Sequence, residues 1–347
     1  MEASPAPRSS TILSHSQTYK EPTRQPWAHL LAGASGGLVT AVVTSPLDVL
    51  RTRLQSDFYQ SGSRPVQTVH SIRHANPSGR LWATFSHVRE TFQIFHSIRY
   101  NEGWRGFFRG LGPSLAGVVP ATAIKFYVYG NCKHLGAWAF NRAENDPVVH
   151  AQAAVVAGIA TATLTNPIWL VKTRLQLDKA KIQADGVAIR QYRNSLDCLR
   201  QVVQTEGIRG FYRGLSASYL GTVETAMHLV IYERLKVMIH YSLGGNGQSP
   251  GEIQTWISTS GAAGSAKLAA VLITYPHEVV RTRLRQAPLE SGIPRYTGLV
   301  HCFQTVWRTE GIGGLYGGLT PHLVRSVPSA VITLGVYEFV LRLCGRQ

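Results

Sequence analysis

The chain has 347 residues, a formal net charge of +16, a mean hydropathy of −0.03 and 44% hydrophobic residues. This length fits two soluble domains or one membrane domain, and the hydropathy argues against a bundle of uniformly apolar helices. The cysteines have no close spacing, so they predict neither a disulfide framework nor a zinc site. They are Cys132, Cys198, Cys302 and Cys344.

A chain this basic could bind nucleic acid. Its basic residues, however, do not form runs, and the sequence contains no zinc finger, RNA-recognition signature or basic heptad. They stand at the ends of predicted helices and in loops, a placement that suits anionic lipid headgroups and an anionic solute. We therefore expect a membrane and an anionic solute as partners, and no nucleic acid.

The first residues, 1–25, are polar and rich in Ser and Pro, which predicts a disordered tail and no secretory signal. Trp27–Leu47 contains no Asp, Glu, Lys or Arg and is long enough to cross a hydrocarbon core of about 30 Å. Pro46 predicts a kink, after which the helix should continue to Gln55.

Ser56–Arg80 is rich in Ser, Gly, Pro and His, which predicts a flexible loop. Leu81–Tyr100 has apolar residues at helical spacing but is too polar to span, so it should lie on the membrane surface. Leu111–Lys133 is a second long apolar segment, and it contains one charge, Lys125.

This order of elements recurs twice. The later long segments are Pro147–Val171, Leu215–Lys236, Ile253–His277 and Leu319–Arg342, and the surface helices are expected near Ser195–Thr205 and Leu299–Thr309. We therefore expect an all-α membrane protein with six transmembrane helices and three short surface helices. The alternative, a soluble α protein, would have to bury six long spans with little surface-type charge.

The loops that follow the odd-numbered spans carry many cations, so the positive-inside rule places them on one side of the membrane and both termini on the other.

Two motifs recur in the same order. SPLDVLRTR, NPIWLVKTR and YPHEVVRTR begin at Ser45, Asn166 and Tyr275, and each is followed by a Glu-Gly sequence such as TEGIRGFYRGL. A fixed long period indicates a repeated module. We place the repeats at 26–140, 147–243 and 252–344.

The first motif reads Pro-x-acid-x-x-base-x-base, except that Trp169 occupies the acid position of the second copy. The proline bends each odd-numbered helix inward, so three helices can converge below a cavity. The acid and base lie on neighbouring faces of one turn. They can therefore pair within one helix, or the acid of one helix can pair with the base of the next in a ring.

These motifs resemble those of the mitochondrial carrier family over about Trp27–Arg342. The resemblance implies a six-helix bundle with three-fold pseudo-symmetry that moves one solute by alternating access. It also implies a monomer that is not an enzyme and holds no cofactor or metal. The sequence itself contains no nucleophile–base pair, metal cluster or phosphate-binding Gly loop after a strand.

The resemblance further implies a gate on the matrix side, closed by ion pairs between neighbouring odd-numbered helices. Its members would be Asp48 with Lys172, Glu278 with Arg51, Arg281, and the bracing Gln55 and Gln176, with kinks at Pro46, Pro167 and Pro276. Trp169 has no charge, so we expect Arg281 to lack a partner. Arg285 stands where a third glutamine would be.

A cytoplasmic gate is also implied, with members Lys133, Glu233, Lys236 and Glu338. YERLK at Tyr232 fits the family pattern, but the other two copies each lack one charge, so only Glu338–Lys133 should pair. Two pairs against one predict that the matrix gate holds more firmly and that the unliganded protein is open to the cytoplasm.

Solute contacts should come from ionisable residues inside the spans, which are costly and usually functional. The candidates are Arg325, Lys125, Lys267, Glu224 and His228, with Gly221. Arg325 is the strongest, because a guanidinium matches phosphate bidentately. An excess of cations predicts a phosphate-bearing anion, with its base against Glu224 and His228.

Each candidate has a structural alternative. Lys267 could extend toward the interface, His228 could be a packing residue, and Glu224 could only hold Lys125 or Arg325.

The family also holds cardiolipin at helix starts, where backbone N–H groups bind phosphate. The matching residues are Arg109, Gly110, Arg213, Gly214 and Gly318.

Trp169 resembles a subset of the family that carries pyrimidine nucleotides, NAD, or flavin and folate. NPIWLVKTRLQL and GLTPHLVRSVP are most similar to the fungal-type pyrimidine nucleotide carriers, although NAD carriers share much of both motifs. We therefore expect an exchanger of pyrimidine (deoxy)nucleoside phosphates of the UTP, CTP and TTP class. It should lie in the mitochondrial inner membrane with both termini toward the intermembrane space.

Overall fold

The computed structural model describes residues 26–56, 91–144, 146–178, 181–182, 188–244, 252–288 and 294–344. The expected N-terminal tail, nearly all of the expected loop Ser56–Arg80, and the first half of the surface helix Leu81–Tyr100 lie outside these residues.

Long helices dominate the fold. They are α1 (Pro26–Val43), α2 (Ser45–Gln55), α5 (Leu111–Ala139), α6 (Pro147–Leu177), α8 (Leu215–Gly244), α9 (Glu252–Leu284) and α11 (Leu319–Cys344). The shorter elements are a helix over 91–101, the 3-10 helix η3 (Trp104–Phe108), α7 (Ser195–Gly210), α10 (Leu299–Leu315) and the paired strands β1 (Lys181–Ile182) and β2 (Ala188–Ile189). The two-residue strands are the one departure from the expected all-α architecture in the described chain.

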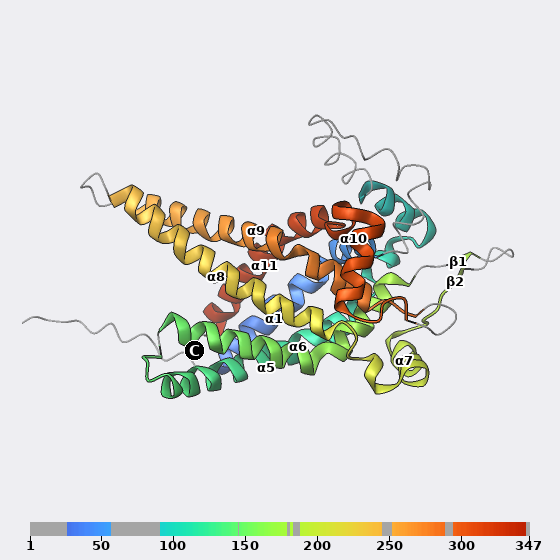
Figure 1. Ribbon diagram of the computed structural model, residues 1–347, viewed down its shortest axis with the longest axis horizontal. Coiled ribbons are helices and arrows are strands. Elements are labelled where there is room, and N and C mark those ends of the chain that lie inside the picture. The colour runs from blue at the N-terminus through green and yellow to red at the C-terminus, as the bar shows by residue number, and fades with distance from the viewer. Residues whose placement is uncertain are drawn as a thin grey trace, which may run out of the picture.

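The long helices form a closed ring. In sequence order, α1 packs on α5, α5 on α6, α6 on α8 and α8 on α9, and α1 packs on α11. Apolar side chains of α9 around Tyr275 contact Leu319 and Leu323 of α11, which closes the ring. Figure 1 shows these helices running side by side, with α7, α10 and the β1–β2 hairpin gathered at one end.

The motif prolines have different places in the helices of the three copies. Between α1 and α2 the axis turns by 67°, and Pro46 lies in the first turn of α2. Pro167 and Pro276 lie inside α6 and α9, which continue through them. A proline lacks the backbone N–H that a helix interior needs, so each copy has a weak point in its helix at the same place.

The helix that carries each motif is tied to the Glu-Gly sequence of its own repeat by a buried arginine. The N–O distances are 2.6 Å for Arg53–Glu102, 2.5 Å for Arg174–Glu206 and 2.5 Å for Arg283–Glu310. The glycine after each glutamate has a φ of +66°, +67° or +68°, a conformation that glycine adopts without strain. The Glu-Gly sequence therefore provides both a partner for the arginine and a sharp turn.

Length and apolar composition identify three described segments that could cross a membrane, namely Trp104–Ala139, α6 and α11, or four if the bent pair α1–α2 is one span. The sequence predicted six. The helices α8 and α9 are equally long but carry more charged residues, among them Glu224 and Lys267.

Candidate functional site

The ring encloses a cavity of about 450 Å³ whose lining comes from α2, α5, α6, α8, α9 and α11. Its walls and base carry six cationic side chains and two carboxylates. They are Arg51, Lys125, Lys172, Arg281, Arg285 and Arg325, with Asp48 and Glu278. The cavity therefore has a marked excess of positive charge, which favours an anionic solute.

Two ion pairs between the motif helices form the floor of this cavity. Lys172 Nζ of α6 lies 3.1 Å from Asp48 Oδ2 of α2, and Arg51 Nη2 of α2 lies 2.6 Å from Glu278 Oε2 of α9. All four side chains are at most 15% exposed. The structure thus brings together both interhelical pairs that the family resemblance implies.

The expectation that Arg281 lacks a partner is wrong. Its guanidinium pairs with Glu278, three residues earlier on α9, because an acid and a base at this spacing lie on one side of a helix. Trp169 itself donates from Nε1 to Thr165 Oγ1 over 2.9 Å, and Lys172 Nζ lies 5.1 Å from the centre of its ring. Arg281 therefore has a partner, but that partner does not join α9 to α6.

The residues expected to brace the floor make contacts of two kinds. Gln55 donates to the Tyr275 hydroxyl (3.1 Å) and accepts from Thr282 (2.8 Å), so it joins α2 to α9. Gln176 accepts from Thr52 over 2.9 Å and joins α6 to α2. Arg285 instead donates to Asn166 and Ser218, at 2.7 and 3.0 Å.

The strongest predicted solute contact, Arg325 on α11, is engaged with the floor. Its Nη1 lies 2.6 Å from Asp48 Oδ1 and its Nε lies 3.3 Å from Thr44 Oγ1. Asp48 consequently accepts from two cations on two different helices. The sequence did not predict this pair, because the motif only relates the odd-numbered helices to one another.

Of the other predicted contacts, Lys267, Glu224 and His228 do not line this cavity. Lys267 Nζ is 2.6 Å from Glu224 Oε1, so the partner of Glu224 is Lys267 and neither of the two cations considered from the sequence. Lys125 lines the cavity, is exposed, and makes no ion pair with any described residue. His228 is partly buried, and its Nε2 has no hydrogen-bond partner in the described structure.

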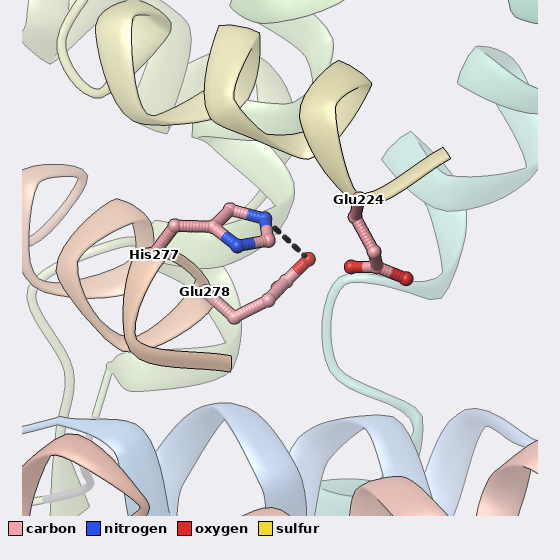
Figure 2. A group of neighbouring side chains, drawn as sticks. All are labelled: Glu224, His277 and Glu278. Carbon is pink, nitrogen blue, oxygen red and sulfur yellow. Dashed lines mark ion pairs between the residues drawn. The ribbon is translucent and has the colours of Figure 1, made fainter. Parts of the chain in front are cut away.

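A residue that the sequence did not single out, His277, lies beside this group. One ligand atom each from Glu224, His277 and Glu278 lies within 4.8 Å of the others (Figure 2). Such a set could hold a metal ion, but Lys267, Arg51 and Arg281 already neutralise its two carboxylates. The positive charge beside it opposes cation binding. The sequence signal that could have identified His277 is its position in the repeat, because the other two copies have Leu47 and Ile168 there.

At the opposite end of the ring, the predicted pair Glu338–Lys133 is not formed. Lys133 Nζ lies 3.7 Å from Glu144 Oε2, and Glu338 Oε2 lies 3.7 Å from Arg342 Nη2 on its own helix. The side chains of Glu233 and Lys236 lie outside the described ones. In the structure, therefore, the ion pairs of the floor are formed, whereas the predicted pair Glu338–Lys133 is not.

The predicted lipid sites lie at the starts of even-numbered spans. Gly110, Gly214 and Gly318 directly precede α5, α8 and α11 with φ values of +79°, +76° and +76°. Arg109 pairs with Asp178 at 2.9 Å, and Arg213 pairs with Glu206 at 2.9 Å. Both arginines are thus held by acids within the protein.

Comparison with known proteins identifies relatives along most of the chain. The family model described as mitochondrial carrier protein matches residues 22–137, 143–243 and 253–347. The mitochondrial pyrimidine nucleotide transporter RIM2 of Saccharomyces cerevisiae is 45% identical over 341 residues, covering 95% of this chain and 89% of that protein.

The mitochondrial carrier protein rim2 of Schizosaccharomyces pombe is 45% identical over 326 residues, with coverages of 92% and 90%. Solute carrier family 25 member 36 of Gallus gallus is 40% identical over 329 residues, with coverages of 92% and 98%.

Proposed function

Because the chain belongs to the mitochondrial carrier family, we propose that it is a transporter that exchanges pyrimidine (deoxy)nucleoside phosphates across the mitochondrial inner membrane. It is not an enzyme. The observation that carries the choice of solute is the cationic cavity above a closed floor, in a chain similar to a pyrimidine nucleotide transporter over nearly its full length.

The same proposal includes the arrangement in the membrane. Six spans in three repeats form a monomeric bundle with both termini toward the intermembrane space, and cardiolipin binds at the starts of α5, α8 and α11. The floor pairs are the matrix gate, and Lys133 and Glu338 belong to the cytoplasmic gate. The described contacts then correspond to a carrier that is open to the cytoplasm and closed to the matrix.

Arg325 couples solute binding to the gate. Its guanidinium donates to Asp48, which also accepts from Lys172. Phosphate oxygens offer the guanidinium a bidentate, charge-assisted alternative, so a bound nucleotide draws Arg325 away and leaves Asp48 with one cation. Because a solute shifts a conformational equilibrium only through unequal affinity for the two states, this exchange of partners gives the nucleotide a means to weaken the matrix gate.

Purified protein in nucleotide-loaded liposomes tests this role. Arg325→Ala should abolish the exchange of labelled UTP, whereas Arg308→Ala, which removes an exposed arginine from α10, should leave it unchanged. Thermal unfolding in detergent checks that both variants fold. Undiminished uptake by folded Arg325→Ala would refute the assignment.

A further inference from the structure

The third copy of the motif carries an additional positive charge at its end. At the second position after the last base, the first two copies have Gln55 and Gln176, whereas the third has Arg285. This side chain lines the cavity, although the residue is only 7% exposed. A guanidinium does not lose its proton in proteins, so the substitution places a permanent charge where the other repeats have a neutral amide.

The hydrogen-bond partners of Arg285 are all neutral. Its Nη2 donates to Asn166 Oδ1 of α6 over 2.7 Å and to Ser218 Oγ of α8 over 3.0 Å. Its Nε is buried without a partner, and Nη1 also has no partner but is not fully buried. The side chain forms no ion pair within the part of the chain that the structure describes. A buried charge is costly unless an opposite charge neutralises it, so this site lacks an anion.

The charged groups that act on Arg285 do not supply that anion. They are Arg281, one turn earlier on α9, and Glu278. Glu278 Oε2 already accepts from both Arg51 and Arg281. One carboxylate thus serves three guanidinium groups, and this side of the cavity has an excess of positive charge.

The facing helix, α6, offers no acid here, because Trp169 occupies the acid position of its motif. Both ion pairs of the floor involve α2, and none joins α6 to α9 among the described residues. The cavity on this side is lined instead by hydroxyl groups and guanidinium groups, including those of Thr165, Ser218 and Arg281. Such donors suit the oxygen atoms of a phosphate, which guanidinium groups bind with charge-assisted hydrogen bonds.

We propose that Arg285 and Arg281 bind the terminal phosphate of a nucleoside triphosphate, an inference that rests on the proposed function. Arg325 lines the same cavity and takes the phosphates nearer to the nucleoside. The terminal phosphate then supplies the negative charge that Trp169 does not. A monophosphate engages Arg325 and leaves Arg281 and Arg285 without that anion. The number of phosphates therefore determines how tightly the solute binds.

The test measures how well unlabelled UMP and UTP inhibit the uptake of labelled UTP into CTP-loaded liposomes. The native protein should bind UTP more tightly than UMP. Arg285→Gln, which restores the residue of the other two repeats, should raise the inhibition constant of UTP about tenfold, as expected for the loss of a charge-assisted hydrogen bond, and leave that of UMP nearly unchanged. Arg285→Lys keeps the charge and should keep the preference for UTP. Arg308→Gln, on the exposed face of α10, is the matched control and should keep both native constants.

A role confined to holding α9 against α6 would give a different result. Arg285→Gln would then slow exchange but leave the two inhibition constants in their native ratio, which would refute the inference. For a variant that folds but does not transport, the rise in melting temperature caused by UMP and by UTP in detergent measures the same preference. Loss of the additional stabilisation by UTP supports the inference, and its retention contradicts it.

The outcomes separate this inference from the proposed function. If the native protein exchanges neither nucleotide, the proposed function fails. If it exchanges UTP but binds UMP and UTP equally, only the role of Arg285 is refuted. Inorganic phosphate tests for an independent anion. If it stabilises the native protein against heat, and Arg285→Gln removes that effect while keeping the native constant for UTP, the site holds a separate anion and the inference is overturned.

Discussion

Replacing Trp169 with aspartate would give the cavity floor a third interhelical ion pair. In the native protein Arg281 turns back to Glu278 on its own helix, and both Trp169 and Arg281 line the cavity. The side chain of Arg281 is 27% exposed. A pair formed there would be intermediate in exposure between surface ion pairs, which are worth about 0.2–1 kcal/mol, and buried ion pairs. A new pair worth about 1 kcal/mol in the closed floor slows opening about fivefold, because each 1.36 kcal/mol is tenfold in rate.

The matched variant is Trp169→Asn, which removes the indole and its contact with Lys172 but adds no charge. Initial rates of UTP exchange in loaded liposomes should be about fivefold lower for Trp169→Asp than for Trp169→Asn, and thermal unfolding of the aspartate variant in detergent should occur at a higher temperature. Equal or faster exchange by the aspartate variant would refute the view that the native floor lacks one bridge.

Asp48→Asn removes the acceptor of two cations, so a cysteine placed on the cavity wall should become more accessible from the matrix side; unchanged labelling would contradict the gate. Glu310→Gln removes the charge paired with buried Arg283 and should lower the free energy of unfolding by about 2 kcal/mol, seen as a lower melting temperature than for the native protein. Burial raises the pKa of Cys198 to about 12, so maleimide at neutral pH should label the partly exposed Cys132 and leave Cys198 unmodified. Rapid labelling of Cys198 in folded protein would show that α7 does not pack as described.

The sequence predicted those features that the repeat determines. The motif sets the position of acid and base on each bent helix, so the pairs Asp48–Lys172 and Glu278–Arg51 followed from the resemblance. It could not predict the contact of Arg325 with Asp48, because the rotation of α11 against α2 depends on packing and not on the spacing within one helix. The same limit applies to His277, because its proximity to Glu224 depends on how α8 and α9 pack.

The pairing of Arg281 also depends on local helix geometry. An empty acid position on α6 predicted an unpaired arginine, but the side chain reaches an acid one turn away on its own helix. The number of spans that composition identifies is lower than the six expected, because helices that line a polar cavity carry charges, and these charges lower their mean hydropathy. Composition alone therefore identifies three or four of them.

The exchange of labelled UTP against internal CTP tests the central claim most directly. Liposomes containing the purified protein and loaded with CTP, NAD, ATP or nothing would be supplied with external labelled UTP. We predict rapid uptake only with internal CTP, and none into empty liposomes. Equal uptake against internal NAD or ATP, or none against CTP, would contradict the assignment of this carrier to pyrimidine nucleotides.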